Sequence, residues 1–145
     1  MANVRVIQNT PDWTLAGTLG AALPIGGGDL NATTTVSYRS LTHQFETAGP
    51  FLDQPGYTLL DAPRVYNFGG GRYSIGIHGK NLTDVRYKTA GYQYIKTDIA
   101  GTPLNAANQP ITNGTGYVPT LGKEGVATAF YGNPRQIFGS FSVKF

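Results

Sequence analysis

The sequence contains no cysteine, and charged residues make up only 13% of it. Without cysteine the chain can form neither a disulfide framework nor a cysteine-based zinc site. The charged share is about half of that in an ordinary soluble domain. The 11 lysines and arginines lie singly along the 145 residues, so no basic cluster is available to bind nucleic-acid phosphates. These shortages argue against disulfide-rich, zinc-binding and nucleic-acid-binding proteins.

Long hydrophobic runs and helical periodicity are also lacking. The longest apolar stretch, residues 16–23, is interrupted by glycine and threonine and falls well short of the roughly 18 residues of a membrane-spanning helix. Apolar residues do not recur at the i, i+3, i+4 spacing, and glycine or proline interrupts almost every window that could hold a helix. The sequence therefore predicts a fold without helices.

Catalytic residues in a recognisable arrangement are absent as well. His43 and His78 are the only histidines, and neither has a carboxylate or a second ligand near it in the sequence at metal-binding spacing. The eight carboxylates show no pairing suited to acid–base chemistry, and no Ser-His-Asp set is evident. We therefore expect no enzymatic activity, no metal site and no cofactor.

The sequence is rich in glycine, with 20 residues, and in aromatic residues, which account for 12%. Alternation of apolar and polar residues is clearest at the C-terminus, where Ile137, Gly139, Phe141, Val143 and Phe145 share one face. A strand of about ten residues with this pattern can cross a bilayer when tilted. Low charge combined with alternation is typical of a transmembrane β-barrel, because only every second residue faces lipid.

The same pattern predicts an all-β fold, an antiparallel meander of about five long strands that forms part of a transmembrane barrel. Glycines near Gly27 and Gly70 predict tight turns, whereas the connections around residues 46–56 and 97–125 are long. Pro63 cannot donate to a strand ladder, so we expect a bulge or a bend there. The predicted strands cover residues 11–23, 30–45, 57–67, 72–95 and 127–145.

Four short motifs occur in an order that resembles the C-terminal part of TonB-dependent outer-membrane receptors. Residues 79–84 (GKNLTD) followed by Tyr87 resemble the family's NLTD-x-x-Y segment, and residues 130–135 (FYGNPR) resemble its closing Y-G-x-P-R. Residues 9–13 (NTPDW) and 38–40 (YRS) resemble upstream strand openings. The resemblance extends from about Asn9 to Phe145.

The resemblance implies a parent barrel of about 22 strands with an internal plug domain, of which residues 1–145 would be the C-terminal portion without the plug. Such a receptor takes up a scarce nutrient, a siderophore, cobalamin or a saccharide, across the bacterial outer membrane. Residues 1–5 carry no apolar signal region, so we expect a longer precursor. The implied partners are outer-membrane lipid, the barrel-assembly machinery, the rest of the barrel with its plug, and TonB through the missing plug region.

Three groups of residues are candidate functional positions. A terminal aromatic strand in such proteins is read by the assembly machinery through strand addition, which assigns an assembly signal to Phe141, Val143 and Phe145. Tyr92, Tyr94 and Tyr117, in or near the long loop, are candidate ligand contacts, with an aromatic belt at the membrane interface as the default interpretation. The remaining motif residues are expected to have structural roles: Asn81, Asp84, Tyr87, Pro134 and Arg135.

Two alternatives remain open. A small autonomous outer-membrane barrel or adhesin would require more strands than the pattern predicts. A soluble β-sandwich that binds carbohydrate would bury one face of each strand and would stay in solution without detergent.

Overall fold

The computed structural model describes residues 6–45, 51–98, 102–120 and 126–145. This part of the chain forms eight β-strands and contains no helix. No helix within it has the length and apolar character needed to span a membrane. Every strand pair is antiparallel, so the prediction of an all-β antiparallel fold is confirmed.

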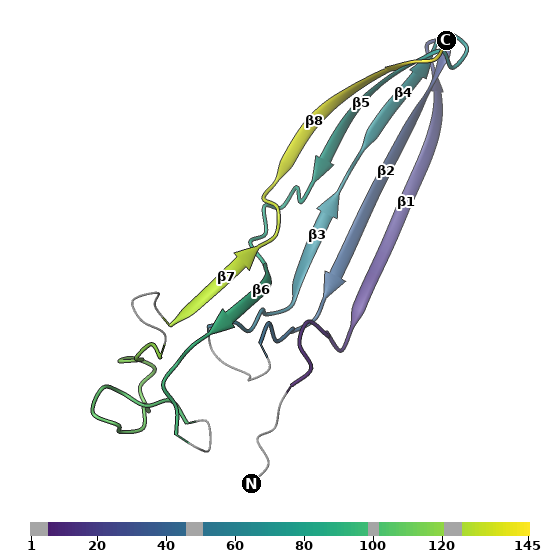
Figure 1. Ribbon diagram of the computed structural model, residues 1–145. Coiled ribbons are helices and arrows are strands. Elements are labelled where there is room, and N and C mark those ends of the chain that lie inside the picture. Colours follow the sequence, from purple (N-terminus) through teal and green to yellow (C-terminus); the bar gives the residue numbers. More distant parts are fainter. Residues whose placement is uncertain (1–5, 46–50, 99–101, 121–125) are drawn as a thin grey trace. The chain divides into compact units, whose positions relative to one another are not determined.

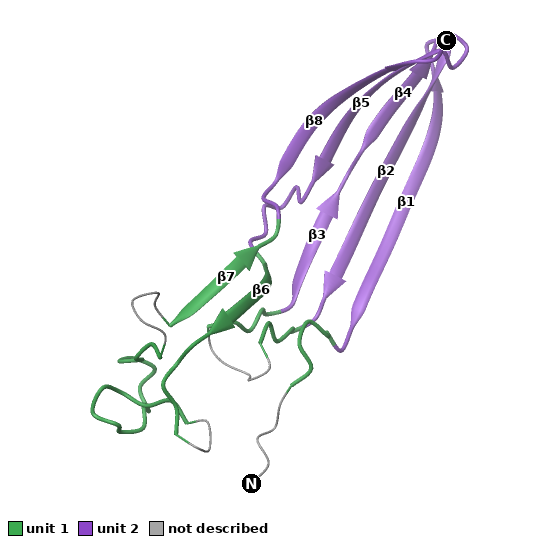
Figure 2. Ribbon diagram, in the orientation of Figure 1, with its two compact units in different colours: residues 1–11, 41–55, 87–132 green, residues 12–40, 56–86, 133–145 purple. Residues whose placement is uncertain are grey.

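The strands belong to two compact units (Figure 2). Unit 1 comprises residues 1–11, 41–55 and 87–132, and unit 2 comprises residues 12–40, 56–86 and 133–145. Unit 2 contains β1 (Thr14–Ile25), β2 (Gly28–Arg39), β3 (Tyr57–Asp61), β4 (Arg64–Phe68), β5 (Tyr73–Lys80) and β8 (Gln136–Val143). Unit 1 contains β6 (Lys88–Gln93) and β7 (Ala127–Tyr131).

The strands of unit 2 form one sheet in the order β1-β2-β4-β5-β8, with β3 in line with β4 (Figure 1). Two glycine turns set this order. Gly26 and Gly27 have φ of 58° and 79°, the positive values that a two-residue hairpin turn requires of both central residues. Gly69, Gly70 and Gly71, which also have positive φ, reverse the chain between β4 and β5. Both turns lie where the glycine runs predict them.

Proline interrupts one predicted strand without shifting its register. The strand predicted over residues 57–67 is divided into β3 and β4 at Ala62 and Pro63. Thr35 lies opposite Asp61 before the interruption, and Ala32 lies opposite Arg64 after it, so no residue is inserted. The missing N–H of Pro63 breaks the ladder locally. Of the bulge or bend expected at Pro63, the bulge is absent, and the strand continues in phase.

Three other strands are shorter than predicted, and eight strands replace the five expected. The strand predicted over 72–95 is divided between β5 and β6, and the strand predicted over 127–145 is divided between β7 and β8. The breaks coincide with Asn81 and Asp84, at φ of 47° and 53°, and with Pro134. The strand predicted over 30–45 ends at Arg39. Positive φ and a missing N–H are incompatible with a regular ladder.

The sheet of unit 2 has one apolar and one mainly polar face. Residues directly opposite each other on paired strands share a face, so the registers assign every side chain. The apolar face carries Leu15, Leu19, Ala21, Leu23, Ile25, Leu30, Ala32, Val36, Tyr38, Leu60, Tyr66, Phe68, Tyr73, Ile75, Ile77, Ile137, Phe141 and Val143, together with the polar residues Thr34, Thr58 and Arg64. The other face carries polar side chains at Thr14, Thr18, Asp29, Asn31, Thr33, Thr35, Ser37, Arg39, Asp61, Asn67, Ser74, His78, Lys80, Gln136, Ser140 and Ser142, together with Ala16, Ala22, Pro24, Tyr57, Leu59, Val65 and Phe138.

Unit 1 is organised around the β6–β7 pair and the segment 51–55. Leu52, 1% exposed, is the one buried hydrophobic residue in the part of the chain that the structure describes. A Cβ atom on Gly91 would lie 2.5 Å from Leu52 Cδ2, so Leu52 packs directly on the backbone of β6. Lys88 Nζ donates to the carbonyl oxygens of Phe51 and Asp53 at 2.7 and 3.0 Å. These contacts hold segment 51–55 against β6.

Candidate functional site

The apolar face of unit 2 is a candidate functional surface. Its side chains are solvent-exposed rather than packed: Leu19 is 79% exposed, Ile137 68% and Phe141 64%. A sheet normally buries its apolar face against a second layer, and among the described residues of unit 2 there is no buried hydrophobic side chain. The face is therefore a hydrophobic surface that the described residues leave uncovered, and contiguous exposed apolar surfaces mark interaction sites when they are large.

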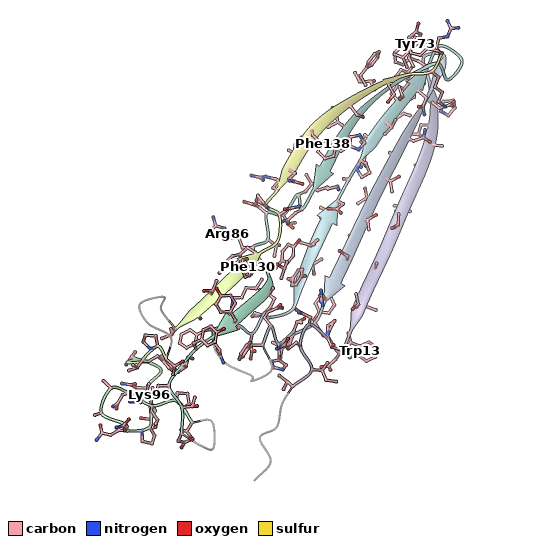
Figure 3. The ribbon with its side chains drawn as sticks, viewed as in Figure 1. Trp13, Tyr73, Arg86, Lys96, Phe130 and Phe138 are labelled. Carbon is pink, nitrogen blue, oxygen red and sulfur yellow. The ribbon has the colours of Figure 1, made fainter. Side chains whose placement is uncertain are left out.

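Aromatic residues lie at both ends of this face. Near the Gly69–Gly71 turn, the Phe68 ring stacks between Tyr66 and Tyr73, with ring centroids 5.6 and 5.4 Å apart. The Tyr66 hydroxyl donates to the carbonyl oxygen of Ile25 at 2.8 Å, which ties β4 to the end of β1. At the other end Trp13 and Tyr38 are exposed, and the Ser40 N–H donates to the Trp13 carbonyl oxygen at 3.0 Å. Figure 3 labels Trp13 and Tyr73 at opposite ends of the sheet.

The polar face is lined by hydroxyl groups and one histidine. Thr18 Oγ1 and Thr35 Oγ1, directly opposite each other, share a hydrogen bond of 3.0 Å. His78 Nε2 and Ser140 Oγ lie 2.8 Å apart, and the His78 ring stacks on Phe138 with centroids 4.9 Å apart. These contacts cross between neighbouring strands and satisfy polar groups within the sheet. The two faces of the sheet thus differ in chemistry, although Leu59, Val65 and Phe138 lie among the polar side chains.

Asn81 joins three parts of unit 2. Its Nδ2 donates to the carbonyl oxygens of Val85 and Asn133 at 2.9 and 3.0 Å, and its Oδ1 accepts from the Val85 N–H at 3.0 Å. Its backbone N–H donates to Asp61 Oδ1 at 2.8 Å. The side chain is only 5% exposed, and φ is positive. Asparagine tolerates this conformation better than most residues and can satisfy the backbone groups around it.

Asp84 and Arg135 complete this turn. The Asp84 N–H donates to the Asn81 carbonyl oxygen at 2.9 Å, and Asp84 Oδ1 accepts from the Arg135 N–H at 3.0 Å. The side chain of Arg135 is exposed, and Pro134 precedes it without a backbone donor. Asn81, Asp84, Pro134 and Arg135, which the two closing motifs supply, therefore meet where β5 ends and β8 begins. Their contacts are between side chain and backbone and involve no catalytic arrangement.

Tyr87, the remaining motif residue, packs in unit 1 on a glycine. A Cβ atom on Gly132 would lie 2.1 and 2.3 Å from two ring carbons of Tyr87 and 2.4 Å from its hydroxyl oxygen. The Gly132 N–H donates to the Tyr87 carbonyl oxygen at 2.9 Å, so backbone and ring both hold this position. The sequence motifs contain both residues, but spacing alone does not indicate that one covers the other.

We expect Gly132→Ala to lower the free energy of unfolding by about 1–3 kcal/mol, because the new methyl group overlaps the Tyr87 ring. Gly17→Ala is the matched control, since a Cβ atom there meets nothing within 4 Å. Denaturant unfolding of both variants measures the difference. Equal stability of the two variants would contradict the contact.

The candidate ligand tyrosines fall into two groups in unit 1. Tyr92 in β6 lies 5.5 Å from Tyr94 and 6.4 Å from Phe130, measured between ring centroids, and all three rings are exposed. Tyr117 instead makes an edge-on contact of 4.7 Å with Phe51. Tyr92 and Tyr94 thus form a small aromatic cluster together with Phe130, which the sequence did not single out. No ring contact joins Tyr117 to this cluster in the described residues.

The assembly-signal residues follow the predicted alternation. Phe141 lies opposite Ile75 and Val143 opposite Tyr73, so both belong to the apolar face. Phe145 is fully exposed, and the preceding Lys144 N–H donates to the Arg72 carbonyl oxygen at 2.9 Å. Pairing therefore continues almost to the last residue, whereas the outer edge of β8 has no partner strand within the described chain.

The structure places a carboxylate beside His43 that the sequence spacing does not indicate. His43 Nδ1 lies 2.8 Å from Asp53 Oδ1 in unit 1, although the two residues are ten positions apart. The pair is brought together by the two 2.9 Å backbone hydrogen bonds between Thr42 and Gln54. No third side chain completes a metal-binding group among the described residues.

Comparison of the chain with protein-family models, curated proteins and solved structures finds no match in any of the three.

Proposed function

We propose that this chain forms part of the wall of an outer-membrane β-barrel of the TonB-dependent receptor type. The observation that carries the proposal is the uncovered apolar face of an antiparallel sheet whose opposite face is mainly polar. Lipid is the occupant that fits this face, because a barrel wall alternates between a lipid-facing and a lumen-facing side chain along every strand. The polar face, with its threonines, serines and His78, would then face the lumen.

The length of the apolar face supports a bilayer as its partner. On β1 the face runs from Leu15 to Ile25, which at about 3.3 Å per residue is roughly 33 Å of strand. At the strand tilt of about 45° usual in membrane barrels this corresponds to about 23 Å, close to the apolar band of about 25 Å in such proteins. The aromatic residues at its two ends, Trp13 with Tyr38 and Tyr66 with Tyr73, match the positions of interfacial girdles.

The edges of the sheet support a larger barrel. The outer edges of β1 and β8 have no partner strand in the described chain, and open edges are not tolerated within a membrane. Because β1 and β8 occupy the first and fifth positions of an antiparallel sheet, they run in the same direction. If copies of this sheet were placed side by side in the same orientation, β8 of one copy would lie parallel to β1 of the next. Closing an antiparallel barrel therefore requires other strands between them. Those strands would come from the rest of the barrel.

The sequence motifs narrow the proposal from a barrel to a receptor family. The residues that resemble the NLTD-x-x-Y and Y-G-x-P-R motifs form the Asn81 turn and the Tyr87–Gly132 contact. In this proposal the protein takes up a siderophore, cobalamin or a saccharide with energy delivered by TonB through the plug region. The assembly machinery would bind the β8 edge and read Phe141, Val143 and Phe145. Substrate contacts from this chain would come from Tyr92, Tyr94 and Tyr117.

Cell fractionation tests this proposal. We expect an antibody against residues 102–120 to detect the protein in the outer-membrane fraction of its source cells, resistant to alkaline carbonate extraction, in a band much heavier than 15.5 kDa. A band of 15.5 kDa in that fraction would instead favour a small autonomous barrel or adhesin. Recovery in the soluble fraction alone would contradict the membrane proposal and favour a soluble β-sandwich.

A further inference from the structure

Pro63 leaves one backbone carbonyl of the sheet without its ladder donor. The unshifted register between β2 and the β3–β4 strand places Thr33 opposite Pro63. The Thr33 N–H donates to the Pro63 carbonyl oxygen at 3.1 Å. In an antiparallel pair of this kind the two residues exchange two hydrogen bonds. Proline has no N–H, so the return bond to the Thr33 carbonyl oxygen cannot form.

The neighbouring Arg64 supplies a donor at this position. Arg64 Nη1 donates to the carbonyl oxygen of Thr33 and, at 2.8 Å, to that of Pro63. Arg64 Nη2 donates to Thr34 Oγ1 at 3.2 Å. The planar guanidinium presents several donors in a fixed arrangement, which allows one side chain to bridge both strands.

The location of Arg64 makes this contact unusual. Among the described residues of the apolar face, Arg64 is the one charged side chain, and it borders a shallow groove lined by Leu30, Tyr66, Ile75, Gly76 and Ile77. A charge on an apolar surface is costly in lipid and is found there mainly when it is paired, for example with backbone carbonyls. An orphaned carbonyl in the same place would also be costly.

We propose that Arg64 is a surrogate backbone donor, and that Pro63 and Arg64 act as a coupled pair. The guanidinium restores the hydrogen bond that proline removes, so the ladder crosses the apolar face with its backbone satisfied. The pair explains why β3 and β4 continue in one register across the interruption. The hydrogen bond from Arg64 to the Thr33 carbonyl oxygen requires only that the sheet folds. It forms whether lipid or another layer covers the apolar face.

A double-mutant cycle tests the coupling in the full-length protein purified from cells that make it. Arg64→Met removes the donors and keeps the apolar stem, while Pro63→Ala restores a ladder N–H. We expect Arg64→Met to lower the folding equilibrium constant, measured by urea unfolding, about tenfold or more when residue 63 is proline. In the Pro63→Ala background we expect less than about a threefold effect. Arg64→Lys, which lacks the fork, should recover only part of the loss.

The control is Arg72→Met, because the Arg72 side chain is exposed at the turn. Its effect should be the same with proline or alanine at position 63. If Arg64→Met abolishes folding with Pro63 but the Pro63→Ala change restores it, the proposal stands. An equal effect of Arg64→Met in both backgrounds, including failure to fold in both, would overturn it. If Pro63 and Arg64 prove to be uncoupled but the protein is still found in the outer membrane, only the proposal for this pair fails and the proposed function stands.

Discussion

Replacing Leu19 by lysine is expected to reduce the free energy of unfolding of the protein in lipid vesicles by about 2–4 kcal/mol. Leu19 lies near the middle of β1 on the apolar face and is 79% exposed. If lipid covers this face, the lysine ammonium must enter the hydrocarbon region or distort the bilayer to avoid it. A charge at the midplane of a barrel wall has a cost of this size. The measurement is urea unfolding of the protein folded into vesicles.

Ala22→Lys is the matched control for this change. Ala22 lies on the same strand, is also exposed and points to the opposite, polar face, where it pairs with Asn31. A lumen-facing lysine remains hydrated, so its effect should stay within about 0.5 kcal/mol. The contrast between the two faces is therefore the expected signature of a membrane wall.

The same pair of variants distinguishes lipid from water. In an aqueous environment Leu19→Lys would replace one exposed side chain by another and would have little effect. Equal stability of the Leu19 and Ala22 variants would contradict a lipid-facing role. A second protein layer over the face would give a loss that persists in detergent-free solution, where a barrel wall would not stay folded.

Asn81→Ala should lower the free energy of unfolding by about 3–4 kcal/mol. The substitution removes three side-chain hydrogen bonds at a position that is 5% exposed and leaves the Val85 N–H and the carbonyl oxygens of Val85 and Asn133 without this partner. Each lost bond costs about 1 kcal/mol. Alanine at positive φ adds about 1 kcal/mol of backbone strain. Denaturant unfolding under conditions in which the wild-type protein is folded measures the total.

Asn108→Ala separates the strain from the hydrogen bonds. Asn108 also has positive φ, 61°, but it is exposed, so its replacement should cost only about the 1 kcal/mol of strain. Asn81→Asp provides a second comparison, because it keeps the Oδ1 acceptor for Val85 and removes the two Nδ2 donors. A loss at Asn81 no larger than that at Asn108 would mean that the turn does not depend on these bonds.

Much of unit 2 follows from local sequence. Alternation of apolar and polar residues requires a sheet with two unlike faces, because successive side chains of a strand point to opposite sides. Gly26, Gly27 and Gly69 have positive φ at the positions where the glycine runs predict turns. Both effects operate within a few residues, so one sequence is enough to reveal them.

The ends of the strands were less predictable. The strands predicted over 72–95 and 30–45 end at Lys80 and Arg39. At each end two polar residues follow one another, Lys80 with Asn81 and Arg39 with Ser40, and the alternation changes phase. At Asn81 the ladder gives way to side-chain hydrogen bonds with segments 20 and 52 residues away. Alternation indicates which side chains a strand places on each of its two faces. The residue at which a strand ends depends instead on whether a neighbouring strand is there to pair with it.

The amino-acid sequence by itself determined the antiparallel all-β class, the two hairpin turns and the chemistry of each face of unit 2. Tertiary structure alone decided which distant groups meet: Asp53 beside His43, the Tyr87 ring on Gly132, and Arg64 at the Thr33 carbonyl oxygen. The reason is physical. A face is set by the two-residue period of a single strand, but contacts between strands are set by register, which emerges only when the whole sheet is paired.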